Sequence, residues 1–428
     1  MIPDFSYSER AKRATDQPIS FLISYAVANP QIISLAAGLV DYETLPTEPL
    51  RELANEVLAS PDRGKSALQY GTTVGLESLR QSLYTHMASL DGESAAAFPG
   101  SPDKVVVTTG SQQLLHLLTD ILVDPGDIVI TGWPTYFVYT GALATLGAEV
   151  RGIEMDEDGM IPDMLDAALE KLRVDGDLSR VKLVYTCPFH QNPTGLTLSV
   201  ARRPQILDIV RRYSTDHRIL VLEDAAYREL TYEGDPPASI KSYDSENKFV
   251  ALLQTFSKPF SPGLKTGYGL LPDDLIDPVI LNKGGRDFGS SNLAQHLLDA
   301  AITTGAYANH VELLCDRYAR KRDAMLTSIE SRIAPLLPGE IEWTRPSGGM
   351  YVWLTLPGRI DTGREGPLFQ FAIEEGVLFV PGEYCYPYDP TRSVPNNAIR
   401  LSFGVPNEQE IDQAIENLSR ALRRVLAG

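Results

Sequence analysis

Cysteine is scarce in this chain of 428 residues, which has only Cys187, Cys315 and Cys385. The three lie far apart and show no CxxC spacing, so we expect neither a disulfide framework nor a metal site. Sparse cysteines of this kind are typical of a reducing compartment. We interpret all three as small packing residues, and the alternative is that Cys187 or Cys385 lines a pocket.

Long apolar runs and positive charge are also lacking. No apolar run approaches the ~20 residues that cross a bilayer, and the amino terminus has neither the apolar core nor the cleavage site of a signal peptide. Lysine and arginine number 38 against 56 aspartates and glutamates, which gives a net charge of −18. Such a chain repels phosphate backbones and anionic lipids. We therefore expect a cytoplasmic protein without nucleic-acid or membrane partners.

The length and the pattern of apolar residues indicate the fold class. A chain this long needs more than one hydrophobic core. Through the middle of the sequence, short apolar runs alternate with helical patterns such as residues 111–122 and 202–213. This alternation predicts an α/β fold, in which a large domain has a mainly parallel mixed sheet flanked by helices. The expected strands are residues 104–109, 127–131, 150–155, 181–186, 218–222, 249–255 and 267–271.

The pattern changes after about residue 290, where longer helices are expected. Helical periodicity covers residues 291–303 and 307–333, strands are expected at 351–356 and 399–403, and a final helix at 408–426. These elements predict a smaller α+β domain. We divide the chain into an N-terminal segment, 1–45, that packs with the small domain, a large domain, 46–305, and the small domain, 306–428.

Ligands of open α/β sheets bind beyond the carboxyl ends of the strands, so residues that follow each expected strand are candidates. Thr109-Gly110-Ser111-Gln112 ends a strand and opens a helix. Gly110 permits a tight turn, and the first amides of the helix form an anion site to which the Ser111 hydroxyl can contribute. A serine that only caps the helix explains the same residues.

Ionisable residues lie at the ends of two later strands. Asp224 follows an apolar run, where a buried carboxylate needs a partner such as a heterocyclic N–H⁺ or a structural arginine. Lys258 follows another run, and a lysine in a pocket forms Schiff bases with carbonyl compounds, although an isolated lysine is usually solvated. A second cation, Lys265, is close enough in sequence to meet the same phosphate.

Two further patterns carry polar groups. Asn192-Pro193-Thr194-Gly195 comes after the strand at 181–186, although residues of this type often only form a turn. Arg400 lies inside an apolar strand, where its charge demands a partner. Its planar guanidinium suits a carboxylate in bidentate fashion, and an internal salt bridge is the alternative.

In this order the motifs resemble those of the class I/II aminotransferases, pyridoxal-phosphate enzymes of fold type I. The pattern is most similar to the branch that contains the kynurenine, 2-aminoadipate and aromatic aminotransferases. The resemblance extends from residue 33 to the final helix. Its motifs are residues 33–39, Leu68-Gln69-Tyr70-Gly71, residues 109–113, Pro134-Thr135-Tyr136, residues 192–195, residues 224–227, Ser257-Lys258, Gly348-Gly349-Met350 and Arg400.

The resemblance implies pyridoxal 5′-phosphate as the cofactor, with Lys258 binding it as a Schiff base and then shuttling a proton. Asp224 would pair with the ring nitrogen, while Gly38, Asn192 and Arg400 would bind the substrate, Arg400 through its α-carboxylate. Tyr70 would reach the phosphate of a neighbouring subunit, which implies a homodimer with shared active sites. The remaining cofactor contacts would come from Ser111, Gln112, Ser257 and Lys265 at the phosphate, from Asn192 and Tyr227 at the ring's 3-oxygen, and from Tyr136 on the ring face.

The activity that the resemblance implies is transfer of the amino group of an L-amino acid to a 2-oxo acid by a ping-pong route, with 2-oxoglutarate as the expected acceptor. A lyase or decarboxylase on the same fold is an alternative, because sequence motifs fix poorly which bond at the α-carbon breaks. A non-catalytic effector-binding domain is a third possibility. It would need a winged-helix module ahead of residue 33, and the acidic charge opposes DNA binding.

The chain departs from the family's pattern at several positions. Lys265 stands where arginine is usual, which keeps the charge but loses the planar fork. Aligning Gln17-Pro18-Ile19-Ser20 with the family's N-terminal segment places Ser20 where the aminoadipate-type enzymes have an arginine that recognises the substrate side chain. This substitution argues against a long dicarboxylic amino acid as the preferred donor. The aromatic-rich segment at 383–388 is expected near the pocket or in ordinary packing.

Overall fold

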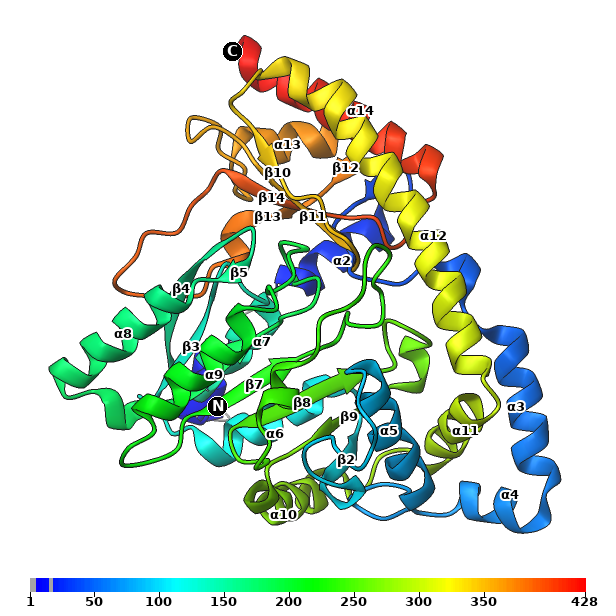
Figure 1. The fold of residues 1–428 in the computed structure, drawn as a ribbon. Coiled ribbons are helices and arrows are strands. Elements are labelled where there is room, and N and C mark those ends of the chain that lie inside the picture. The colour runs from blue at the N-terminus through cyan, green and yellow to red at the C-terminus, as the bar shows by residue number, and fades with distance from the viewer. Residues whose placement is uncertain (1–4, 15–17) are drawn as a thin grey trace.

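One large sheet organises the middle of the chain (Figure 1). The computed structural model describes residues 5–14 and 18–428. All neighbouring strands from β8 to β4 pair in parallel, whereas β9 and β5 run antiparallel to their neighbours. The spatial order is β2 (Val105–Thr108), β9 (Gly267–Leu270), β8 (Val250–Thr255), β7 (Leu220–Asp224), β6 (Val181–Thr186), β3 (Ile128–Trp133), β4 (Glu149–Asp156) and β5 (Gly159–Met160).

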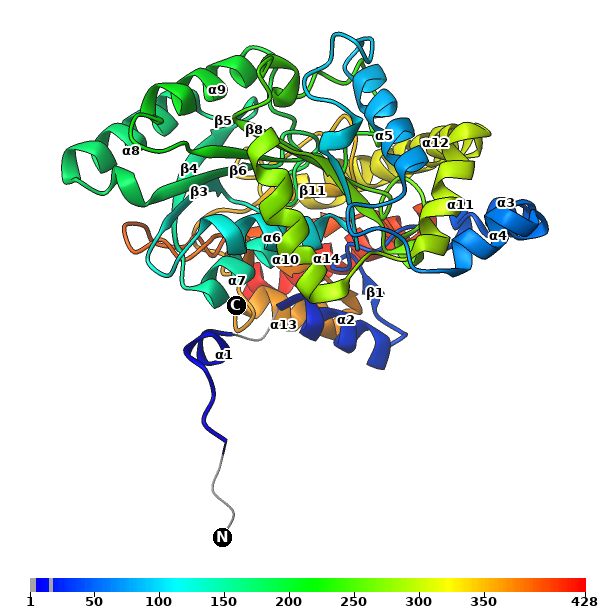
Figure 2. The ribbon, with the colours of Figure 1, turned by 90° about the horizontal axis from the view of Figure 1, so that it is seen from below.

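Helices cover both faces of this sheet (Figure 2). One face packs against α5 (Glu77–Leu90), α8 (Pro162–Asp175) and α9 (Arg202–Tyr213). The other face packs against α6 (Ser111–Leu122), α7 (Phe137–Leu146) and α10 (Ile276–Asp287). Along β2 the side chains alternate, so that Val106 joins the α6 face while Val105 and Val107 join the α5 face. The predicted α/β fold class with a mainly parallel mixed sheet is confirmed.

A second hydrophobic core forms around a four-stranded antiparallel sheet near the carboxyl terminus. The spatial order is β10 (Glu342–Trp343), β11 (Tyr351–Thr355), β14 (Ala398–Ser402) and β13 (Val380–Pro381). Packed around it are α12 (Ala306–Ser328), α13 (Pro367–Glu374) and α14 (Glu408–Ala427). The helix expected at 307–333 is α12, followed by a more widely wound π-helical turn over Ile329–Ile333.

Local sequence explains where α14 begins. The Asn407 side chain accepts hydrogen bonds from the backbone of Gln409 and Glu410, and the Glu410 side chain accepts one from the backbone of Asn407. This reciprocal capping satisfies amides that a helix start otherwise leaves unpaired. Short 3₁₀ turns connect other elements, at Tyr42–Thr44, Pro102–Lys104, Leu178–Arg180, Ile240–Tyr243, Pro262–Leu264, Asp273–Leu275, Ala334–Leu336 and Gly382–Cys385.

The N-terminal residues contact both cores. The strand β1 (Ile33–Ser34) pairs in parallel with β12 (Val377–Leu378), while α1 (Glu9–Arg13) lies against α7. There Arg13 donates hydrogen bonds to backbone carbonyls at the end of α7. The helix α2 (Pro18–Ala28) lies between them in sequence. Residues 1–4 and 15–17, including Gln17 of the aligned segment, lie outside the described residues, and the three-part domain division stays a prediction.

Three helices stand beside the large sheet. The neighbours α3 (Thr47–Ala59), α4 (Pro61–Leu68) and α11 (Asn292–Thr303) pack on one another.

Within residues 5–14 and 18–428, no helix combines the length and the apolar character that spanning a membrane requires.

Candidate active site

A cavity of about 260 Å³ lies at the carboxyl ends of β6, β7 and β8, next to the first turn of α6. Parallel strands bring their carboxyl ends to one edge of a sheet, so residues far apart in sequence meet there. Nine of the predicted site residues line this cavity: Ser111, Gln112, Tyr136, Asn192, Asp224, Tyr227, Ser257, Lys258 and Lys265.

One end of the cavity is built for an anion. The backbone at Gly110 has a φ of +73°, and α6 begins at Ser111 without a side-chain cap. Ser111 is therefore the first helical residue, and the interpretation of it as a capping serine is wrong. A methyl group at Gly267 would lie 2.2 Å from the backbone nitrogen of Ser111, so only glycine lets β9 approach this helix start. The free amides, the hydroxyls and Lys265 together suit a phosphate.

The carboxyl group of Asp224 is buried near the other end. Its Oδ2 accepts a hydrogen bond from the Tyr185 hydroxyl at 2.9 Å, and its Oδ1 has no hydrogen-bond partner within the described part of the chain. Burial raises the pKa of Asp224 to about 6, against the effect of the bond from Tyr185. The Asp224 side chain is thus partnered by a tyrosine and not by a structural arginine, and one oxygen remains free for a donor.

The amine of Lys258 points to the N-terminal segment. Its Nζ donates a hydrogen bond to the backbone carbonyl of Gly38 at 2.7 Å. Burial lowers the pKa of Lys258; Tyr351 opposes this effect, while the charges of Arg400 and Lys265 add to it. A lowered pKa increases the fraction of neutral amine, the form that attacks a carbonyl carbon. The surface-lysine interpretation is excluded.

Arg400 is buried on β14 and is held by polar groups of neutral charge. Its guanidinium donates to the side-chain oxygen of Asn192 at 2.8 Å and to the backbone carbonyl of Ala36 at 2.7 Å. Its Nε has no hydrogen-bond partner, and no carboxylate forms an ion pair with it, among residues 5–14 and 18–428. The internal salt bridge is therefore excluded, and the buried cation is available to an anionic ligand.

Sequence reasoning missed two tyrosines of this site. Tyr185, the penultimate residue of β6, lines the cavity. Tyr351 follows the Gly348-Gly349-Met350 motif, and its hydroxyl lies 3.1 Å from that of Tyr227 while its ring lies 4.4 Å from the Arg400 guanidinium. For Tyr185, the signal in the sequence was the alternation of side chains toward the end of a strand. For Tyr351, the signal was its position directly after a recognised motif.

Tyr70 is not part of this cavity. Its side chain is 84% exposed, and its ring packs edge-on against the exposed ring of Phe288, with 5.7 Å between the centroids. A single copy of the chain therefore leaves Tyr70 on the surface. Its role at the phosphate of a neighbouring subunit stays a prediction.

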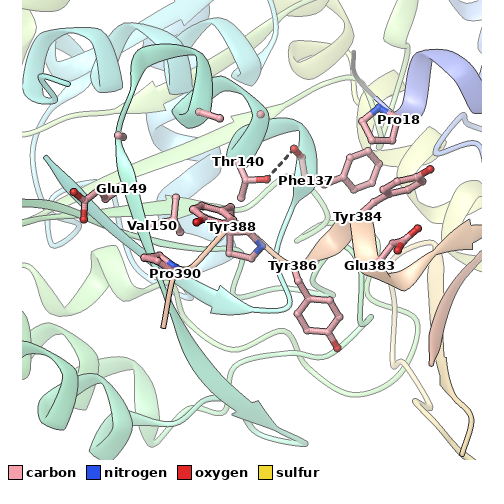
Figure 3. A pocket seen from close by; sticks show the side chains of 14 residues that line it. Pro18, Phe137, Thr140, Glu149, Val150, Glu383, Tyr384, Tyr386, Tyr388 and Pro390 are labelled. Atoms are coloured by element: carbon pink, nitrogen blue, oxygen red, sulfur yellow. Dashed lines mark hydrogen bonds between the residues drawn. The ribbon is translucent and has the colours of Figure 1, made fainter. Parts of the chain in front are cut away.

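A second pocket, of about 620 Å³, lies outside the cavity with Lys258 (Figure 3). Its wall is formed by the outer side of α7, by β4 and by the segment 383–390, with Pro18 at one side. The tyrosines of the aromatic-rich segment, Tyr384, Tyr386 and Tyr388, line this pocket and not the site described above. No group of three potential metal ligands is found in the described ranges.

The comparisons with known proteins decide the family. A sequence profile described as "Aminotransferase class I and II" matches residues 30–418. The chain belongs to the class I and II aminotransferase family.

Individual relatives agree with this assignment. The chain is 33% identical to aromatic-amino-acid aminotransferase 1 of Thermococcus litoralis, over 97% of this chain and 94% of that protein. It is 32% identical to 2-aminoadipate transaminase of Thermus thermophilus, over 93% and 92% of the two chains. The solved structure of a kynurenine aminotransferase of Pyrococcus horikoshii, in complex with PMP, superposes with a TM-score of 0.87 at 32% identity, covering 98% and 97% of the chains. The chain is accordingly an aminotransferase enzyme, and its family is dependent on pyridoxal phosphate.

Proposed function

We propose that the enzyme uses pyridoxal 5′-phosphate to move the amino group of an L-amino acid to a 2-oxo acid, with 2-oxoglutarate as acceptor. The observation that carries the proposal is the free Oδ1 of Asp224, buried in the same cavity as a lysine of lowered pKa and an anion-binding helix start. An unpaired buried carboxylate oxygen is costly unless a ligand supplies a donor. A protonated pyridine nitrogen is such a donor.

The lining residues fit this cofactor from end to end. Ser111, Gln112, Ser257 and Lys265 would hold the phosphate, and Asp224 would accept from the ring N–H⁺. Asn192 and Tyr227 would hydrogen-bond the 3-oxygen, and the half-buried ring of Tyr136 would lie on the ring face. When bound, the cofactor supplies an aldehyde for the amine and a ring that withdraws electrons from the substrate's α-carbon.

The chain's own groups would then divide the work. Lys258 would bind the cofactor, and its amine would hold and return the proton of the α-carbon. Arg400 binds the substrate carboxylate through its unpartnered Nε, together with the groups now turned to Asn192 and Ala36. Asp224 stays ionised and keeps the ring nitrogen protonated.

One site serves both substrates in turn. An amino acid and a 2-oxo acid carry the same carboxylate next to the reacting carbon, so Arg400 can hold either of them. This supports a ping-pong order, in which the donor leaves as an oxo acid before the acceptor binds. The relatives act by name on aromatic amino acids, 2-aminoadipate and kynurenine. Because Ser20 supplies no cation, we propose aromatic and other uncharged donors ahead of dicarboxylic ones.

A half-reaction tests this function. The purified protein, loaded with pyridoxal phosphate, is mixed with single amino acids in the absence of any oxo acid, and the cofactor is followed by absorbance. Conversion to the pyridoxamine form, reversed by 2-oxoglutarate, is expected. Release of carbon dioxide or ammonia without that conversion would instead identify a decarboxylase or lyase.

We also propose that two copies of the chain share their active sites. The exposed Tyr70 and Phe288 stand beside the exposed side chain of Leu68, and apolar groups exposed together in this way mark interaction surfaces. The test mixes two inactive variants, Lys258→Ala and Tyr70→Ala, after unfolding and refolding together. If Tyr70 serves the partner's site, a mixed dimer has one intact site and activity returns. If each Tyr70 serves its own subunit, no site is intact and activity stays absent.

A further inference from the structure

The hydroxyl of Tyr185 donates to one carboxylate oxygen of Asp224, and the other oxygen has no hydrogen-bond partner among residues 5–14 and 18–428. Tyr185 is fully buried on β6, and it donates a hydrogen bond to Oδ2 of Asp224 at 2.9 Å. The free Oδ1 is equally buried. The carboxylate is thus fixed in orientation, with one oxygen held by the protein and the other available to the cavity.

The position of Tyr185 is itself fixed from behind. Its ring packs on the ring of Tyr139 from α7, with 4.4 Å between the centroids. The hydroxyl of Tyr139 lies 2.9 Å from Oγ1 of Thr119. The Thr119 hydroxyl donates its only proton to the carbonyl of Leu115 at 2.7 Å. Tyr139 must therefore donate to Thr119. This arrangement ties the tyrosine pair to α6, the helix whose first turn lines the other end of the cavity.

We propose that Tyr185 is a positioning residue that keeps Asp224 ionised and aims its free oxygen at the ring nitrogen of the cofactor. The proposal rests on the function proposed above. It goes beyond the cofactor contacts, because Tyr185 acts through Asp224 and not on the reacting atoms.

Tyr185 and the backbone amide of Ala226 both lower the pKa of Asp224, and Tyr185 has the larger effect. The titratable groups that face Asp224 are Tyr136, Tyr139, Tyr185 and Cys187, and burial raises the pKa of each, so all four are neutral. Burial alone disfavours the charge of Asp224. The hydrogen bond from Tyr185 is the side-chain contact that favours the ionised form. Without it, the pKa of Asp224 rises further toward neutral pH, and the carboxyl group is then partly protonated where the enzyme works.

The test is Tyr185→Phe, which keeps the ring on Tyr139 and removes only the hydroxyl. Tyr307→Phe is the matched control, because Tyr307 is also buried and also donates to a carboxylate, Glu229, at 2.6 Å, but does not line the cavity. In the apoprotein, carbon-13 NMR of labelled aspartate side chains gives the pKa of Asp224, with Asp224→Asn identifying its signal. We expect a higher pKa in Tyr185→Phe and no change in Tyr307→Phe.

Cofactor binding provides a second readout. We expect the dissociation constant of pyridoxal phosphate to increase roughly 10- to 100-fold in Tyr185→Phe, as for a lost hydrogen bond to a charged group. The acid limb of the kcat profile should move to higher pH. An unchanged Asp224 pKa, with cofactor affinity within twofold of the wild type, would overturn the proposal. If the wild type itself bound no pyridoxal phosphate, the proposed function would fail, while the NMR measurement would still decide the role of Tyr185.

Discussion

The amine of Lys258 donates a hydrogen bond to the backbone carbonyl of Gly38, which is 220 residues away in sequence, at 2.7 Å. A buried amine needs an acceptor, and the N-terminal segment supplies it. The same segment offers the Ala36 carbonyl to Arg400. Lys258 and Arg400 therefore both hold one short stretch of N-terminal backbone in place.

Replacing Lys258 by alanine should remove the covalent attachment of the cofactor and the proton carrier. We expect a colourless protein after gel filtration and a loss of activity of at least about 100-fold. Absorbance and a coupled amino-transfer assay measure the two effects. Lys248→Ala, at an exposed ion pair with Glu246, is the control and should behave as the wild type. A Lys258→Ala enzyme at wild-type rate would disprove the assignment.

Gly38 is required because Tyr351 leaves no space for a side chain. A methyl group at Gly38 would lie 2.5 Å from the Tyr351 hydroxyl oxygen, but 3.6 Å from the nearest ring carbon. Gly38→Ala should therefore displace the N-terminal segment around residue 38. The expected loss in kcat/KM corresponds to about 1–3 kcal/mol of activation free energy. Adding Tyr351→Phe to Gly38→Ala should restore much of that loss relative to Tyr351→Phe alone. Equal losses in both backgrounds would show that the hydroxyl is not the obstacle.

Gly267 should be essential for holding the phosphate. Its alanine variant places a methyl group 2.2 Å from the backbone nitrogen of Ser111, which cannot move without shifting the start of α6. We expect cofactor affinity to fall by about 1–3 kcal/mol, measured by fluorescence titration of the apoprotein. The control is Gly263→Ala, where the nearest neighbouring atom, Oγ of Ser261, would be 3.7 Å away. Comparable affinity in both variants would contradict the tight contact.

The stabilisation by cofactor should depend on pH through Asp224. Its pKa in the folded apoprotein is about 6, above the value of a free aspartate, so between these values the folded state retains a proton that the unfolded state releases. The apoprotein thus loses stability as pH rises through this window. A ring N–H⁺ removes the penalty, so the gain in Tm on adding cofactor should increase up to about pH 6 and then level off. Asp224→Asn should abolish this trend, and its persistence there would assign the effect elsewhere.

Arg400 should bind the carboxylate of either substrate. Arg400→Ala is expected to raise KM and to cost about 2–4 kcal/mol in kcat/KM, as for a truncated partner of a buried charge pair. Arg400→Lys keeps the charge but loses the planar fork of the guanidinium. This variant should therefore recover only part of the kcat/KM that Arg400→Ala loses. Steady-state kinetics with an amino acid and its oxo acid measure both half-reactions. A change of less than a few-fold in the alanine variant would rule out this role.

Much of the fold was predictable because buried strands have a strong local signal. The strand at 181–186 and the helix at 202–213 were predicted with the bounds of β6 and α9. The strand expected at 218–222 is shifted, since β7 runs over Leu220–Asp224. Its register is set by pairing with β6 and β8, which a single sequence does not display. The shift makes Asp224 the last residue of the strand.

The candidate residues were predictable where a motif marks them, and not where only packing does. Lys258, Asp224 and Asn192 stand at strand ends or turns with characteristic neighbours. Tyr185 and Tyr351 lie within apolar strands, where a tyrosine is also an ordinary packing residue. They differ from packing tyrosines in the partners of their hydroxyls, which are Asp224 for Tyr185 and Tyr227 for Tyr351. These partners come from distant parts of the chain, so the sequence does not reveal them.

The bond between Arg400 and Ala36 joins residues 364 positions apart. During synthesis on the ribosome, Arg400 is made only after almost the entire chain, so the N-terminal segment lacks this partner until then. The large sheet can close before then, because its edge strand β2 pairs with β9 and both precede β14 in the chain. Amino-transfer activity therefore begins only once the last strands are made, and chains that end early are inert polypeptides and not weaker enzymes.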